Sequence, residues 1–137
     1  GPAGPVVVGV DGSEGSVAAL RWAAAETDAP IHAIYAISYP FGPVDPVVEP
    51  EFTNHEDFGR QVVEQTVALA LGDDTGRVTA AATGGDARDV LIQVVEALDA
   101  SLLVTGARGA KGLTGIGSVP TAVMAHSRVP VVVVPTR

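Results

Sequence analysis

Short aliphatic runs alternate along the chain with longer segments in which apolar residues recur at helical spacing. The aliphatic runs predict five strands, at residues 6–10, 31–37, 77–82, 101–105 and 131–134. The periodic segments between them predict helices that follow Ser13, run over residues 54–71, follow Asp86, and run over residues 118–126. Because each strand is almost wholly aliphatic, we expect a parallel sheet buried on both faces. The pattern predicts a single α/β domain of the doubly wound class, with helices on both faces of the sheet.

Local signals sharpen several of these elements. Ser13 and Asp86 are of the residue types that cap helix N-termini. Phe58, Val62 and Leu69 lie at helical spacing and are expected to face the core, as is Trp22. The segment 39–50 contains four prolines, which excludes a helix or a central strand and predicts an irregular loop.

Composition and charge narrow the classes of function. A chain of 137 residues, 47% hydrophobic, suits one domain spanning 1–137, in which residues 1–4 are expected to be disordered or derived from a tag. No apolar run approaches the ~20 residues of a membrane-spanning helix. The lack of cysteine excludes disulfides and thiolate chemistry, and it permits a cytoplasmic location, which we expect. A net charge of −8 with only eight basic residues argues against binding nucleic acid or an anionic membrane surface.

Two loops have the character of a ligand site, because in an open parallel sheet ligands bind where strands end and helices start. The first loop is Val10, Asp11, Gly12 and Ser13, where the aspartate is expected to meet a ligand rather than serve only as a helix-end charge. The second runs from Gly106 to Ser118 and has five glycines in thirteen positions. Glycines expose backbone N–H groups that suit phosphate oxygens, and a helix that opens at Ser118 favours an anion. Arg108 adds a charged donor, although a plain flexible connection would also explain this segment.

Catalytic and metal chemistry find little support. His32, His55 and His126 are scattered and form no recognisable acid–base constellation, so we expect no enzyme, or at most slow ATP hydrolysis. No metal-ligand spacing occurs among them. Any Mg²⁺ would arrive with a nucleotide and be held by phosphate oxygens.

Three segments together resemble the universal stress protein family, in its actinobacterial form, over nearly the whole chain. They are the opening stretch 7–23, the turn at Gly85–Ala87, and the closing stretch formed by 106–119 with 129–135. The resemblance implies a five-stranded sheet in the order 3-2-1-4-5, in which both loops meet at one crevice between strands 1 and 4. It also implies a homodimer joined through the strand Val131–Val134, acting as a regulator that senses stress or energy.

The resemblance further implies an adenine nucleotide, ATP first, in that crevice. Asp11 would contact the adenosine portion, and backbone near His32 and Ala33 would line the base. The phosphates would lie on the glycine-rich segment, at positions that match the family motif: Gly106, Arg108, Gly109, Gly117, Ser118 and Val119.

One departure from the family pattern keeps alternatives open. Nucleotide-binding members usually read G-x2-G-x9-G-(S/T), whereas only seven residues separate Gly109 from Gly117 here. Two missing residues remove up to ~7 Å of reach. The loop is expected either to wrap a diphosphate or triphosphate by a tighter path, or to prefer AMP or a cyclic nucleotide. The alternative function is a dimeric interaction scaffold of the same fold that binds no nucleotide.

Overall fold

The computed structural model describes residues 4–37, 55–107 and 118–136. Within these residues five parallel strands form one sheet in the order β3-β2-β1-β4-β5. The strands are β1 (Val6–Gly9), β2 (Ile31–Ile37), β3 (Val78–Gly84), β4 (Leu102–Gly106) and β5 (Val131–Val134). The helices are α1 (Glu14–Glu26), α2 (His55–Leu71), α3 (Ala87–Leu98) and α4 (Ser118–His126). The predicted fold class and strand order are confirmed, while the loop predicted at 39–50 lies outside the described residues.

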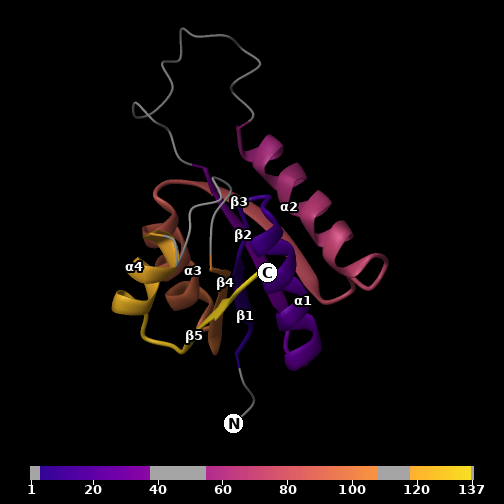
Figure 1. Cartoon of the computed structure of the whole chain (residues 1–137). Helices are drawn as coiled ribbons and strands as arrows, with labels where there is room; N and C mark the ends of the chain where they lie inside the picture. Colours follow the sequence, from indigo (N-terminus) through magenta and orange to yellow (C-terminus); the bar gives the residue numbers. More distant parts are fainter. Residues whose placement is uncertain (1–3, 38–54, 108–117, 137) are drawn as a thin grey trace, which may run out of the picture.

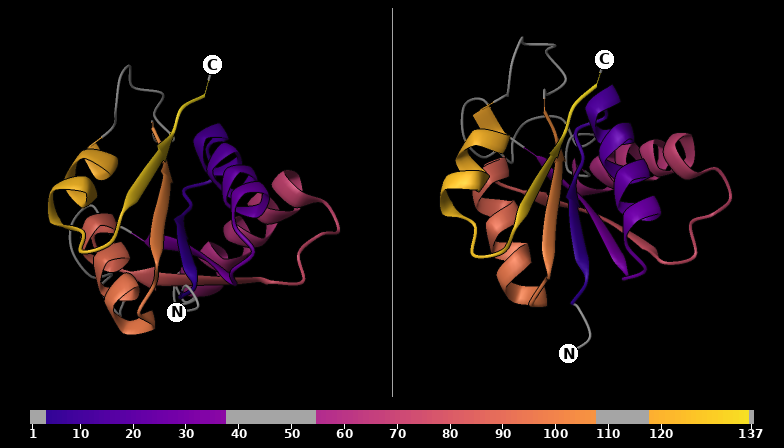
Figure 2. Two further views of the ribbon diagram at one scale, coloured as in Figure 1. Left: turned by 90° about the horizontal axis from the view of Figure 1, so that it is seen from below. Right: turned by 60° about the horizontal axis from the view of Figure 1, so that its bottom comes forward.

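The helices cover the sheet from both sides, with α1 and α2 on one face and α3 and α4 on the other (Figures 1 and 2). Successive side chains of a strand point to opposite faces of the sheet, so β1 contributes residues to the apolar layers on both faces. Val6 and Val8 pack in the layer below α1 and α2, where Trp22 also lies partly buried. Val7 packs in the layer below α3 and α4. Burial on both faces explains why the strands read as continuous aliphatic runs.

The expected inner face of α2 is wrong. Phe58 is 64% exposed and Leu69 is 71% exposed, and Val62 is only half-buried. The buried positions are small or β-branched: Gly59, Val63, Thr66 and Val67.

The physical reason lies in how closely α2 approaches the sheet. A Cβ on Gly59 would stand 2.7 Å from the Cβ of Ala82, so only glycine fits at this contact. Thr66 is buried because its hydroxyl donates to the carbonyl of Val62 at 2.7 Å, which satisfies it within the helix. Spacing of large apolar residues therefore indicated the wrong face of this helix.

The N-terminal caps predicted for α1 and α3 are confirmed, and the end of α1 has a further contact that the sequence analysis did not predict. The Ser13 side chain accepts from the Ser16 N–H, and the Asp86 side chain accepts from the Asp89 N–H. At the other end of α1, the Arg77 guanidinium donates to the carbonyls of Ala24 and Ala29, both at 2.6 Å. Arg77, which directly precedes β3, thereby bonds to one carbonyl in the last turn of α1 and to one in the connection between α1 and β2.

Candidate functional site

The candidate site lies at the carboxyl edge of the sheet, between the ends of β1 and β4. These strands are neighbours, yet the helix that follows β1 covers one face and the helix that follows β4 covers the other (Figure 1). In open α/β sheets in general, such a reversal leaves a crevice outside the carboxyl ends of the strands, and ligands bind there. Val10 continues β1 to this edge, since its N–H donates to the carbonyl of Ile34 at 2.9 Å.

Asp11 is oriented by the first turn of α1. Its Oδ1 accepts from the Ser13 N–H at 3.0 Å, from the Ser13 hydroxyl, and from the Ser16 hydroxyl at 2.8 Å. Ser16 also accepts from the Asp11 N–H at 2.8 Å, so it bonds both ends of this residue. Gly12, between Asp11 and Ser13, forms the turn with a φ of +83°, a conformation that favours glycine. The carboxylate itself is exposed and held in one place by its own chain.

Ser16 is a residue that sequence reasoning missed. It is 3% exposed, and it links the strand end to the helix start. A serine in the first helical turn, five residues after an aspartate at a strand end, was the available signal. The contacts of Asp11 with Ser13 and Ser16 are within the chain, and the contact of Asp11 with a ligand stays a prediction.

Gly106 brings the end of β4 against the start of α1. A Cβ at this position would stand 2.7 Å from the Cα and carbonyl carbon of Gly15 and 2.8 Å from its oxygen. The two backbones therefore touch, which holds the first turn of α1, with Asp11 and Ser13 beside it, next to the end of β4. The next residue, Ala107, donates its N–H to the Val134 carbonyl at 3.0 Å.

Other predicted site residues are distributed as follows. Ala33 lies inside the sheet, fully buried and in register with Val8, and His32 is half-buried in register with Val7. Ser118 and Val119 open α4, whose N-terminus lies at the same edge as the end of β4 (Figure 1). Arg108, Gly109 and Gly117 lie outside the described residues.

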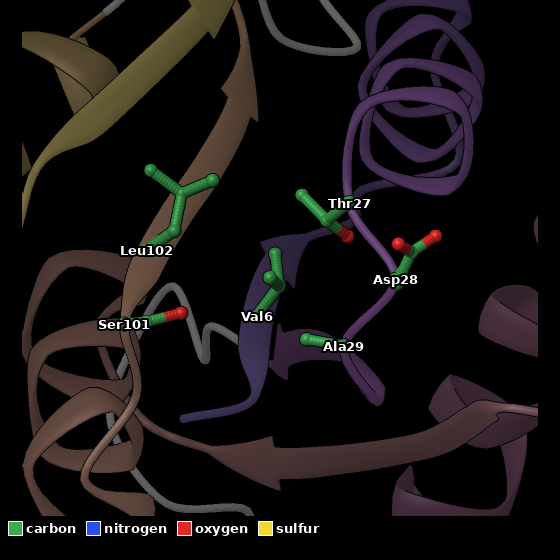
Figure 3. A pocket seen from close by; sticks show the side chains of 6 residues that line it. All are labelled: Val6, Thr27, Asp28, Ala29, Ser101 and Leu102. Atoms are coloured by element: carbon green, nitrogen blue, oxygen red, sulfur yellow. The ribbon is translucent and has the colours of Figure 1, made fainter. Parts of the chain in front are cut away.

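A separate hollow of about 350 Å³ lies at the opposite, amino-terminal edge of the sheet. Figure 3 shows its lining by Val6, Thr27, Asp28, Ala29, Ser101 and Leu102. The Thr27 hydroxyl donates to the Ala23 carbonyl at 2.8 Å, and the Ser101 hydroxyl donates to the Gly4 carbonyl at 2.7 Å. These hydroxyls already donate to backbone carbonyls, and ligands of open α/β sheets bind at the carboxyl ends of the strands rather than at this edge. We therefore do not assign a ligand to this hollow.

Two further structural features of the described residues concern metal binding and membrane spanning. Among the described residues, no group of three or more histidine, aspartate and glutamate side chains is placed to hold a metal ion. Within the same ranges, none of the helices has the length and apolar character to cross a membrane.

The strand order and the helices on both faces define a doubly wound α/β domain, with the candidate ligand site at its topological switch point. The sequence matches the Universal stress protein family over residues 3–135, and the chain belongs to that family. It is 35% identical over 143 aligned residues to a universal stress protein from Mycolicibacterium smegmatis (strain ATCC 700084 / mc(2)155), covering 94% of this chain and 47% of the relative. The chain thus spans about half the length of the curated relative it matches.

Solved structures share the fold. A universal stress protein in complex with cAMP has a TM-score of 0.69 and 24% identity, with 98% of each chain covered. A universal stress protein family protein from Arabidopsis thaliana, with AMP bound, has a TM-score of 0.62 and 22% identity, covering 99% of this chain and 93% of the other.

Proposed function

We propose that this protein binds an adenine nucleotide, ATP foremost, in the crevice between β1 and β4. In this proposal it acts as a dimeric, cytoplasmic sensor of stress or energy state with little or no turnover. The observation that carries the proposal is the oriented carboxylate of Asp11, held by Ser13 and Ser16 beside the contact of Gly106 with Gly15. The cAMP and AMP complexes of structurally similar family members support an adenine nucleotide as the ligand.

The residues at this edge suit a ligand that carries both hydroxyl groups and anionic groups. The Asp11 carboxylate is an acceptor suited to ribose hydroxyls, and Gly12 and Ser13 allow a ligand to approach the backbone closely. The N-terminus of α4, at Ser118 and Val119, favours a phosphate. Because the protein carries a net charge of −8, we expect phosphate binding to rely on backbone N–H groups, Arg108 and any Mg²⁺ that accompanies the nucleotide.

A second candidate is a scaffold of the same fold that binds no nucleotide. Two observations favour it. Asp11 Oδ1 already accepts from Ser13 and Ser16, which gives this carboxylate a structural role. The interval between Gly109 and Gly117 is also two residues shorter than the family motif.

An amide-resonance titration with Mg-ATP, AMP and cyclic AMP separates the two candidates. Nucleotide binding at the proposed site shifts the amides of Asp11, Gly12 and Gly106, and leaves those of Ala29 and Leu102 at the opposite edge unmoved. If none of the three nucleotides moves the first group at saturating concentration, the proposal is abandoned for the scaffold.

The proposed dimer rests on β5, an edge strand of the sheet that pairs with β4. The carbonyl of Pro130, just before β5, accepts from the Leu103 N–H of β4 at 3.0 Å, and the carbonyl of Val134, at the end of β5, accepts from the N–H of Ala107, which follows β4, also at 3.0 Å. Successive residues of a strand direct their backbone N–H and C=O groups to opposite sides. The backbone groups of Val132 therefore face β4, and those of Val131 and Val133 face the free edge of the sheet. An aliphatic free edge of this kind pairs readily with another chain.

A proline exchange tests this interface. Val133→Pro removes an outward N–H without breaking the β4 ladder, so we expect a folded monomer by light scattering at concentrations where the parent is a dimer. The matched change Val132→Pro removes an N–H that faces β4, and it is expected to destabilise the fold itself. A Val133→Pro protein that stays dimeric contradicts pairing through this edge.

A further inference from the structure

Thr105 carries a buried hydroxyl to which none of the described residues hydrogen-bonds. The residue is 5% exposed, and its Oγ1 finds no hydrogen-bond partner within the part of the chain that the structure describes. Buried polar atoms are almost always paired, because an unpaired one loses its water without compensation. An orphaned hydroxyl at the end of a strand, beside a proposed ligand site, therefore calls for a physical explanation.

The placement of Thr105 gives its side chain a direction. Leu103, two residues earlier, packs with Val123 of α4 in the apolar layer on that face of the sheet. Residues two apart on a strand point the same way, so the Thr105 side chain is on the α4 face, one step nearer the carboxyl edge. Its methyl carbon lies 3.5 Å from where a Cβ on Gly9 would stand, which places the methyl on the β1 side.

The start of α4 lies at the same edge and on the same face. Ser118 opens this helix, and the third residue, Pro120, lacks the N–H that would otherwise be left free there. A helix N-terminus attracts anions through its free N–H groups and its dipole. The orphaned hydroxyl and the helix N-terminus thus come from two different elements that lie at the same edge of the sheet and on the same face.

We infer that the Thr105 hydroxyl donates to a phosphate oxygen of the nucleotide, from the floor of the site at the N-terminus of α4. The inference rests on the proposed function and assigns a phosphate-contacting side chain within it. A threonine hydroxyl is a suitable donor to a phosphate, and its burial strengthens the bond, because the local dielectric is low. The alternative partner is a buried water molecule, which would satisfy the same atom without any ligand.

Two conservative substitutions at Thr105 test the inference. Thr105→Val removes the hydroxyl and keeps the volume, whereas Thr105→Ser keeps the hydroxyl and loses only the methyl. We expect Thr105→Val to weaken binding of AMP and ATP by roughly tenfold to a hundredfold, as for the loss of a hydrogen bond to a charged group. Thr105→Ser keeps affinity within about threefold, and adenosine, which has no phosphate, binds the parent and the valine variant alike.

Thermal unfolding without added nucleotide separates the ligand from a trapped water. A hydroxyl that has no partner is replaced by a methyl at no cost, so Thr105→Val is expected to melt at or above the parent temperature. A melting temperature several degrees lower means that the hydroxyl is already bonded to water, and this overturns the inference.

The affinities of the parent and the valine variant distinguish failure of this inference from failure of the proposed function. If the parent binds AMP and the valine variant binds it as tightly, or if adenosine loses as much affinity as AMP, the assignment to phosphate is wrong and the proposed function stands. If the parent binds neither AMP nor ATP by calorimetry, the proposed function fails, and the inference fails with it.

Discussion

Gly106→Ala is the substitution whose effect the structure determines most directly. The added Cβ would stand 2.7 Å from two backbone atoms of Gly15 and 2.8 Å from a third, closer than such contacts occur. Backbone atoms at the start of a helix have no alternative rotamer, so α1 must move away from β4 as a body. The strain falls on the contact that holds the first turn of α1 at the candidate site.

The expected magnitude follows from the cost of overpacking. Inserting a carbon into a close-packed contact destabilises a protein by typically 1–3 kcal/mol, so we take about 2 kcal/mol. For 137 residues the entropy of unfolding is about 0.3 kcal/mol per kelvin near the melting temperature. The melting temperature is therefore expected to fall by roughly 7 °C.

Calorimetry at fixed protein concentration measures this shift, with Gly76→Ala as the matched control. A Cβ on Gly76 meets nothing within 4 Å, and Gly76 is not among the described residues with positive φ, so this change is expected to be neutral or slightly stabilising. If Gly106→Ala melts within about 1 °C of the parent, the close approach of α1 to β4 is refuted.

Three further predictions concern stability and are measured by urea unfolding. Arg77→Met removes the bonds to the Ala24 and Ala29 carbonyls at the end of α1 and just beyond it, and is expected to cost ~1.5–3 kcal/mol. Arg128→Met, at a side chain 83% exposed with an ion-pair contact at 4.0 Å, is expected to stay within ~0.5 kcal/mol, and equal losses would contradict the role of Arg77. Asp99→Gly relieves a left-handed residue at φ of 51° that ends α3, and is expected to gain up to ~1 kcal/mol, so a clear loss would show that the aspartate side chain matters. Ser16→Ala breaks both bonds to Asp11 and is expected to cost about 1–3 kcal/mol, and an unchanged midpoint would show that the turn holds without it.

Much of the fold was predictable because strands buried on both faces of a sheet appear in the sequence as continuous aliphatic runs. The strands Ile31–Ile37 and Val131–Val134 and the helix Ser118–His126 have the predicted bounds, since aliphatic runs and turn residues delimit them. The inner face of α2 was not predictable from the spacing of large apolar residues. Close packing selected Gly59 instead, through its contact with Ala82 of β3, a residue distant in the sequence. Thr66 can be buried because its hydroxyl is satisfied within the helix, by the carbonyl of Val62.

The candidate site was predictable in position and less so in detail. Because the winding reverses between β1 and β4, the loop at Asp11 and the strand end at Gly106 had to meet at one edge. The role of Ser16 was missed, since its bonds depend on how α1 leaves the strand. Thr105 was missed as well, because a lone hydroxyl in an aliphatic strand has no pattern that distinguishes it from an ordinary β-branched residue.

The measurement that tests the central claim most directly is thermal unfolding with Mg-ATP, AMP, cyclic AMP and GTP in parallel. A ligand at about a hundred times its Kd adds ~2.7 kcal/mol to the folded state, a rise of roughly 5–12 °C for a domain of this size. We predict a rise with at least one adenine nucleotide and none with GTP, and the ranking of ATP against AMP will show what the shortened glycine segment holds. No rise with any of the four, in a protein that unfolds cooperatively, contradicts nucleotide binding and leaves the scaffold.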